Sequence, residues 1–210
     1  MNEQTSVLRQ IFIELSGRYS GDQMLAEKLW EEIYMAYSEK GRHYHTLAHL
    51  ANLLSELENV KSQVNDRDVV LFTLFYHDIV YRATGDKNEE KSAQLAQLRL
   101  TELSFPQEKI TRCIGMILAT KGHTVTGDND TDYFTDADLS ILGQTKNLYS
   151  EYARQVRKEY SVYPAFIYNQ GRKKVLNHFL NMTRIYKTSY FFDHFELQAR
   201  DNMKDELKTL

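Results

Sequence analysis

Apolar side chains return every three or four residues in segment after segment of this 210-residue sequence, and no segment alternates apolar and polar residues as a strand would. Each stripe predicts a helix that buries one face. The stripes lie at residues 7–15, 25–37, 50–60, 69–75, 93–100, 110–118, 148–160, 175–180 and 191–203. We therefore expect an all-α protein, and the length suits a single domain over residues 1–210.

Local signals mark where several of these helices begin and end. Gly41 is a natural C-terminal stop for the second helix. Asn65 or Asp66 could cap the fourth helix, and Ser104-Phe-Pro-Gln107 has the Ser-x-x-Gln pattern of a capping box before the sixth. The polar segment 124–132 is typical of an exposed loop. The expected fold is thus a helical bundle with one longer polar loop.

Composition excludes several classes of function. The formal net charge is −3 and 26% of the residues are charged, so we expect no general attraction to nucleic acid polymers or to anionic membranes. The single cysteine, Cys113, cannot form an internal disulfide, and its place on an apolar face predicts core packing. No apolar run approaches the roughly 18 residues needed to span a bilayer, and residues 1–6 lack the apolar core of a signal peptide. We expect a cytoplasmic protein, whose oligomeric state the sequence does not indicate.

An adjacent histidine and aspartate, His77 and Asp78, interrupt the otherwise apolar run from Phe72 to Tyr81. Burying two such groups without partners would cost several kcal/mol. A divalent cation removes this cost, because a neutral imidazole nitrogen and a carboxylate oxygen are both good ligands for it. The doublet therefore predicts a metal site whose other ligands come from elsewhere in the chain.

Two further segments supply candidate ligands. His45 and His49 are four residues apart, the spacing that places side chains on one helix face. If Thr46 caps that helix, His45 lies just outside it and His49 lies in its first turn; the sequence leaves this boundary open. Asp136 and Asp138 come later, before a short apolar segment. Residues two apart on a helix point in roughly opposite directions, so only one of them can face the histidines. The spacing alone does not show which of the two is the ligand.

Together these motifs give the chain a resemblance to the HD superfamily of metal-dependent phosphohydrolases, and more narrowly to stand-alone bacterial proteins predicted to be HD phosphohydrolases. The resemblance rests on Arg42-His-Tyr-His-Thr-Leu-Ala-His49, His77-Asp78, Asn88-Glu-Glu-Lys-Ser-Ala93, Ala119-Thr-Lys-Gly-His123 and Asp136-Ala-Asp-Leu139. It implies an all-α, HD-type helical bundle with the metal-site core at about residues 42–140 and C-terminal helices at 147–210 packed on it. The metal ligands that it implies are His49, His77, Asp78 and Asp138.

The resemblance also implies a reaction. Two neutral imidazoles and two carboxylates balance the charge of one divalent cation and leave open positions for water and substrate. The implied activity is hydrolysis of a small phosphate mono- or diester, with nucleotides among the candidates, by a water that the metal activates. The cation expected is manganese, iron, nickel, cobalt, zinc or magnesium, since mixed nitrogen and oxygen ligation suits transition metals better than calcium.

A second similarity assigns a role to His45. The segment Tyr44-His-Thr-x-x-His49 is similar to the Tyr-His-Asn-x-x-His pattern of class I cyclic-nucleotide phosphodiesterases, although Thr46 stands where that pattern has asparagine. The similarity implies that His45 protonates the leaving oxygen while His49 binds metal. Further candidates are Lys121 and His123 as catalytic groups, and Arg82 and Glu89 as substrate-binding groups.

Two other interpretations remain open. An HD-type di-iron oxygenase would recruit His45 and His123 for a second iron, and a non-catalytic HD module would bind a nucleotide or another ligand without turnover. Spacing excludes two further classes. A zinc protease of the His-Glu type needs Glu directly after the first histidine, where Thr46 stands. A ferritin-like bundle needs Glu three residues before a histidine, which none of the 7 histidines has.

Overall fold

The computed structural model describes residues 3–210, and over this range the chain forms ten α-helices and no strand. The prediction of an all-α protein is confirmed. In chain order the elements are α1 (Glu3–Gly17), α2 (Gln23–Tyr37), α3 (Leu47–Asn59), α4 (Arg67–Tyr76), α5 (Asn88–Glu102), α6 (Gln107–Ala119), α7 (Asn129–Asp138), the 3-10 helix η1 (Leu139–Gly143), α8 (Lys146–Glu159), α9 (Ala165–Asn181) and α10 (Ser189–Leu207). Within the described part of the chain, no helix is both long and apolar enough to cross a bilayer.

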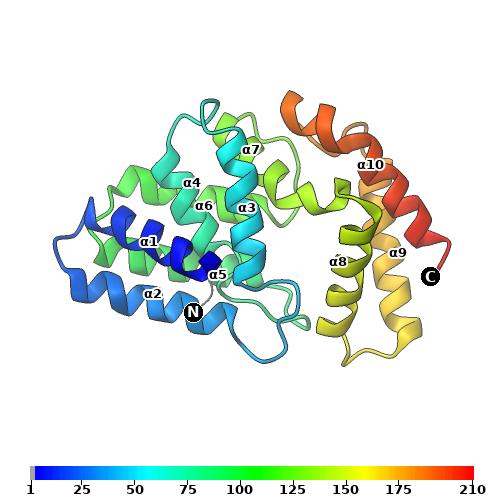
Figure 1. The fold of residues 1–210 in the computed structure, drawn as a ribbon, viewed down its shortest axis with the longest axis horizontal. Coiled ribbons are helices and arrows are strands. Elements are labelled where there is room, and N and C mark those ends of the chain that lie inside the picture. Colours follow the sequence, from blue (N-terminus) through cyan, green and yellow to red (C-terminus); the bar gives the residue numbers. More distant parts are fainter. Residues whose placement is uncertain (1–2) are drawn as a thin grey trace.

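Helix α4 lies among the N-terminal helices and determines where the site is built (Figure 1). Its residues from Val69 to Tyr76 are all buried, as expected for a helix that is apolar on every side. Helices α1, α3, α5, α6 and α7 all pack against it. On one side Phe12 of α1 meets the Phe75 ring edge-on, with centroids 5.1 Å apart and an interplanar angle of 80°. The residue that follows α4, His77, is consequently buried.

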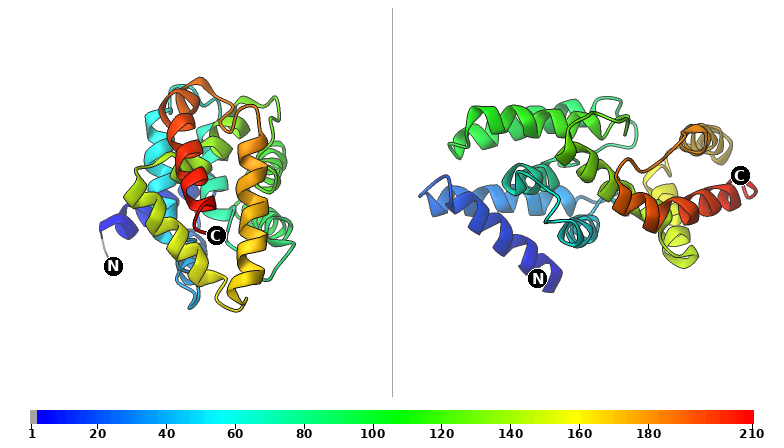
Figure 2. Two further views of the ribbon diagram at one scale, coloured as in Figure 1. Left: turned by 90° about the vertical axis from the view of Figure 1, so that its right-hand side faces the viewer. Right: turned by 90° about the horizontal axis from the view of Figure 1, so that it is seen from above.

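Helices α8 and α9 run in opposite directions and lie on the far side of the molecule from α1 and α2 (Figures 1 and 2). We call this pair the C-terminal hairpin. Helix α10 packs on α9 and, with the segment before it, on η1: the Tyr186 hydroxyl donates to the Leu139 carbonyl at 2.8 Å, and the Asn202 amide donates to the carbonyls of Leu142 and Gln144 at 2.9 and 2.7 Å. These bonds hold α10 against η1, which directly follows Asp138, the last residue of α7.

Gly143 lets η1 approach α10 closely. A Cβ added there would lie 2.5 Å from the Phe195 Cβ and 2.6 Å from its carbonyl oxygen. We expect Gly143→Ala to lower the free energy of unfolding by about 1–3 kcal/mol, since backbone must shift to remove the clash. Gly115→Ala is the matched control, because a Cβ at this exposed position in α6 would contact nothing and should stabilise the helix by about 0.5–1 kcal/mol. Urea unfolding measures both, and equal effects would contradict the assigned role of Gly143.

Several predicted helix boundaries are confirmed and others are wrong. Thr46 and Asp66 are the N-caps of α3 and α4, which leaves His45 outside α3. The capping box predicted at Ser104–Gln107 is absent, because Ser104 takes a positive φ of 60° and Pro106 is the N-cap of α6. Helix α2 ends at Tyr37, well before Gly41. The predicted loop at 124–132 is shorter, since Asp128 caps α7 and accepts a hydrogen bond from the Thr131 amide at 2.9 Å.

Candidate metal centre and cleft

Three side chains from three helices converge on one point. His49 lies in the first turn of α3, His77 directly follows α4, and Asp138 is the last residue of α7. The two Nε2 atoms are 3.2 Å apart, and the Asp138 Oδ1 lies 3.2 Å from the His49 Nε2 and 3.7 Å from the His77 Nε2. All three ligand atoms lie within 4.8 Å of one another. Both histidines are buried, and Asp138 is half-buried.

This arrangement fits a bound cation. The His77 Nδ1 lies 3.0 Å from the Leu74 carbonyl oxygen, which can only accept, so Nδ1 carries the proton and the Nε2 lone pair points at the cluster. Two neutral Nε2 lone pairs at 3.2 Å repel each other unless a proton or a cation lies between them. Imidazole nitrogens with a carboxylate oxygen are ligands that zinc, manganese, iron, cobalt and nickel accept. The three residues could therefore hold a divalent metal ion.

Asp78 lies at the edge of this group. Its Oδ2 is 3.3 Å from the His77 Nε2 and 3.9 Å from the His45 Nε2, but Asp78 does not belong to the set of three atoms that share one centre. When a proton rather than a cation lies between the imidazoles, His77 is charged. Burial opposes ionisation of Asp78, yet the charge and hydrogen bond of this protonated His77 outweigh it and hold the pKa of the carboxyl well below its usual range. Burial likewise opposes ionisation of Asp138, and the hydrogen bond from His49 with the charge of His77 lowers its pKa to about 2. Both groups are carboxylates at neutral pH.

His45 lies beside the cluster and is held by a residue from the C-terminal hairpin, Glu159. The Nδ1 of His45 is 2.8 Å from the Glu159 Oε2, and the Tyr81 hydroxyl donates to the same oxygen at 2.9 Å. The Tyr81 ring stacks on the imidazole, with centroids 4.1 Å apart. Burial alone would lower the pKa of His45, but the hydrogen bond to Glu159 and the charge of Asp78 raise it above its usual value. His45 thus has one nitrogen fixed by Glu159 and the other near Asp78.

Glu159 also shapes the loop that carries His45. Its Oε1 accepts hydrogen bonds from three successive backbone amides, those of His43, Tyr44 and His45, at 2.7, 2.8 and 3.0 Å. The sequence alone does not indicate this role, because Glu159 lies more than 100 positions from the three amides that it binds. One signal was present: Glu159 follows Val156 and Tyr152 at spacings of three and seven, so a carboxylate lies on the apolar stripe of its helix.

Arg42 connects the loop that carries His45 to the segment that carries Asp78. Its guanidinium donates to the carbonyls of His45, Asp78 and Ile79 at 3.2, 2.7 and 2.8 Å. The side chain is buried over the Tyr37 ring, 4.9 Å from its centroid. Arg42 therefore fixes the position of the His45 loop relative to Asp78, a role that the sequence did not indicate.

We expect Glu159→Gln to destabilise the protein in a pH-dependent way. Burial opposes ionisation of Glu159, but its hydrogen bond to His45 and its backbone bonds lower its pKa from 4.5 to about 2. A depressed pKa gives stability that is present above the unfolded-state value and is lost as the pH falls through the folded-state value. The variant should therefore unfold more easily at pH 7, by on the order of 3 kcal/mol, and the difference should shrink between pH 4.5 and about 2.

Urea titrations at a series of pH values measure this difference. Glu151→Gln is the control, because Glu151 lies on the same helix in a solvent-exposed pair with Arg154, and a pair of this kind contributes little to stability at any pH. A difference for Glu159→Gln that stayed constant down to pH 3 would assign its contribution to packing rather than to charge.

The other predicted site residues lie at different distances from the cluster. The His123 Nε2 is 3.8 Å from the Asp138 Oδ2, and burial lowers the pKa of His123 to about 4. Glu89 lines the cleft described below. Lys121 is exposed and does not line that cleft; it pairs with Glu90 and with the Asp86 carbonyl, and its Nζ lies 3.8 Å from the Glu89 Oε2. Arg82 lines a separate hollow with Thr84. The structure thus brings His123 and Glu89 to the site and leaves Lys121 paired with acidic groups at its edge.

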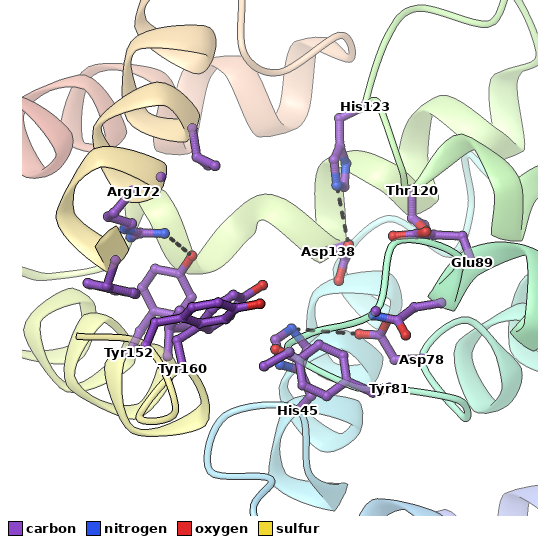
Figure 3. Close-up of a pocket in the computed structure, with 18 of the residues that line it drawn as sticks. His45, Asp78, Tyr81, Glu89, Thr120, His123, Asp138, Tyr152, Tyr160 and Arg172 are labelled. Atoms are coloured by element: carbon purple, nitrogen blue, oxygen red, sulfur yellow. Dashed lines mark hydrogen bonds and ion pairs between the residues drawn. The ribbon is translucent and has the colours of Figure 1, made fainter. Parts of the chain in front are cut away.

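A cleft of about 530 Å³ opens between the metal cluster and the C-terminal hairpin (Figure 3). One wall carries His45, Asp78 and Asp138, and the facing wall carries Tyr152, Tyr160 and Arg172 of the hairpin (Figure 3). Sites for small molecules in proteins have volumes of about 300–1,000 Å³, so the cleft is large enough for a small organic ligand beside the cluster.

Comparison with known proteins gives no further assignment, since no protein-family model, no curated protein and no solved structure matches the chain at a significant level.

Proposed function

We propose that the protein is a metal-dependent phosphohydrolase that hydrolyses a small phosphate mono- or diester. The observation that carries the proposal is the convergence of His49, His77 and Asp138 at the wall of an open cleft, with His45 beside them. A buried set of two imidazoles and a carboxylate leaves a divalent cation with open coordination positions. Asp138 belongs both to the cluster and to the cleft, so a substrate in the cleft would reach the cation directly.

The ligands proposed are His49, His77 and Asp138, with Asp78 as a fourth, because its Oδ2 lies 3.3 Å from the His77 Nε2. A small movement of the Asp78 carboxylate would complete the HD-type ligand set. When bound, the cation supplies an activated water and polarises the phosphoryl oxygen. Manganese, iron, nickel, cobalt, zinc and magnesium are all candidates for this ion.

The chain's own contribution to the reaction is the proton that the leaving oxygen needs. Glu159 accepts the Nδ1 proton of His45, so the Nε2 atom is the one that can donate into the cleft. Burial opposes protonation of His45, but the hydrogen bond to Glu159 and the charge of Asp78 outweigh it and raise the pKa of His45 above its usual value, which favours the protonated ring. His45 is thus suited to general acid catalysis, and Glu159 acts as the positioning residue that fixes the ring.

The test is a panel of phosphate mono- and diesters assayed with manganese, cobalt, nickel, magnesium and zinc in turn, alongside the metal content of the purified protein. We expect close to one divalent ion per chain and metal-dependent release of phosphate or of a phosphomonoester. Two irons per chain and a coloured protein would instead support an HD-type oxygenase. Nucleotide affinity without turnover with any metal would support a binding module and contradict the proposal.

A further inference from the structure

We infer that the cleft selects phosphate esters that carry one phosphate and a planar, uncharged ring, and that it rejects polyphosphates and cationic esters. This inference rests on the proposed function and specifies the substrate class of the same site. Two independent features carry it: the tyrosines of the C-terminal hairpin, and the balance of charge along the cleft.

The hairpin wall of the cleft is aromatic and aliphatic. Tyr152, Tyr160, Tyr163 and Tyr168 line it with Val156 and Val175. The Tyr160 and Tyr163 rings stack with centroids 6.2 Å apart at an interplanar angle of 30°. Figure 3 shows Tyr152 and Tyr160 across the cleft from Asp138 and His45. A ligand whose phosphate reaches the cluster would thus place its other end against these rings, which favour a flat partner.

Among the described residues, no unpaired lysine or arginine lines the cleft and could bind a second phosphate. Among residues 3–210, Arg172 is the single lysine or arginine that lines it. Its Nε and Nη2 donate to Glu206 at 2.8 and 2.9 Å, and its Nη1 donates to the Tyr152 hydroxyl at 3.2 Å. All of its nitrogens are therefore engaged and its charge is balanced. The cleft also contains Asp78, Asp138 and Glu89, and Lys121, whose Nζ lies 3.8 Å from the Glu89 Oε2, is already paired with Glu90. Phosphates beyond the one at a bound metal would therefore face carboxylates and no unpaired cation.

A cationic group is a poor alternative occupant, although tyrosines and carboxylates can attract one. The Arg172 guanidinium lies over the Tyr152 ring, 5.2 Å from its centroid, and the Arg157 guanidinium lies over the Tyr168 ring at 4.6 Å. One face of each ring is therefore taken by a protein cation, which would repel a second positive charge. An uncharged ring avoids this repulsion and keeps the stacking.

Esters with the same kind of leaving group test the inference. Adenosine 5′-monophosphate, benzyl phosphate, ribose 5-phosphate and phosphocholine all release a primary alcohol, so they differ chiefly in the attached group. We expect kcat/KM for the two ring esters to exceed those for ribose 5-phosphate and phosphocholine by about 10-fold or more. Adenosine 5′-triphosphate should be a weaker competitor than the monophosphate by on the order of 10-fold. The comparison of adenosine with benzyl esters distinguishes a nucleobase from a simple aryl group.

Variants of Tyr160 test whether the tyrosines of the C-terminal hairpin cause the preference for ring esters. Tyr160→Leu should lower kcat/KM for the ring esters by about 10-fold and leave ribose 5-phosphate within about 2-fold, whereas Tyr160→Phe keeps the ring and should retain the preference. Tyr190→Leu is the matched control, because Tyr190 stacks on His194 in α10 and does not line the cleft. Equal rates for ring and ribose esters, or faster hydrolysis of phosphocholine or the triphosphate, would overturn the inference and leave the proposed function intact.

Binding to metal-free protein separates the two proposals. Calorimetry with adenosine and with benzyl alcohol measures ring binding without hydrolysis. If no ester is hydrolysed but either compound binds and Tyr160→Leu weakens it, the proposed function fails and the ring preference stands. If neither compound binds and no ester is hydrolysed, both are wrong.

Discussion

Replacing Asp138 with asparagine is expected to remove the bound metal and with it all hydrolysis. The Oδ1 of Asp138 lies 3.2 Å from the His49 Nε2 and is the only carboxylate oxygen in the three-atom cluster of the described residues. A neutral amide leaves the cation with two imidazoles and the proposed fourth ligand Asp78, and it removes one of the two negative charges from the coordination of the ion. Loss of an outer partner of a ligand costs about 10–100-fold in metal affinity, and loss of the ligand itself should cost more. Metal analysis after dialysis and initial rates of hydrolysis measure the two effects.

Asp136→Asn is the matched control for this experiment. Asp136 lies two residues away and is fully buried, where it accepts hydrogen bonds from the backbone amides and side chains of Lys187 and Thr188. We expect this variant to keep its metal while its free energy of unfolding falls by about 3 kcal/mol, because Lys187 loses its buried partner. Metal loss in Asp136→Asn and retention in Asp138→Asn would show that the wrong aspartate has been assigned to the ion.

His45→Gln is expected to keep the metal and to lose most turnover. The side chain lies outside the three-atom cluster, and its Nε2 is 3.9 Å from the Asp78 Oδ2. General acid catalysis contributes about 10²–10⁴-fold, so hydrolysis of an alkyl ester should fall by that factor. A nitrophenyl ester should suffer less, because its leaving group departs as a stable anion. Steady-state kinetics on both esters, with metal content measured in parallel, check the prediction.

Glu159→Gln is the companion variant, because it disturbs the orientation of the same ring and leaves the imidazole in place. Its loss of turnover should be smaller than that of His45→Gln and should show the same dependence on the leaving group. If His45→Gln instead loses its metal, His45 is a ligand. If it slows both esters equally, His45 positions the substrate and donates no proton.

Much of the fold follows from the spacing of apolar residues. The stripes at 7–15 and 191–203 lie in α1 and α10, and the burial of Cys113 in α6 was expected from its place on such a stripe. Periodicity says little about helix ends, which depend on individual backbone angles. Ser104 occurs in a capping-box pattern but takes a left-handed φ of 60°. Pro106, whose ring fixes φ, is the N-cap of α6 instead.

The candidate site was predictable where its residues occur in local patterns. His49 precedes a helical stripe, His77 follows an apolar run, and Asp138 ends a short polar helix. Contacts between distant segments have no local pattern, so the roles of Glu159 and Arg42 emerge only from the fold. The same reason explains Lys121: the sequence places it beside His123, but in three dimensions Glu90 lies nearest to its ammonium group.

The hydrogen bonds of Glu159 make one part of the site depend on the C-terminal hairpin. The proposed metal ligands lie in α3, directly after α4 and at the end of α7, whereas the group that orients the proposed proton donor comes from the end of α8. Partial unfolding that releases the C-terminal hairpin would therefore stop proton delivery before it releases the ion. Heat or urea should abolish hydrolysis at milder conditions than those that remove the metal.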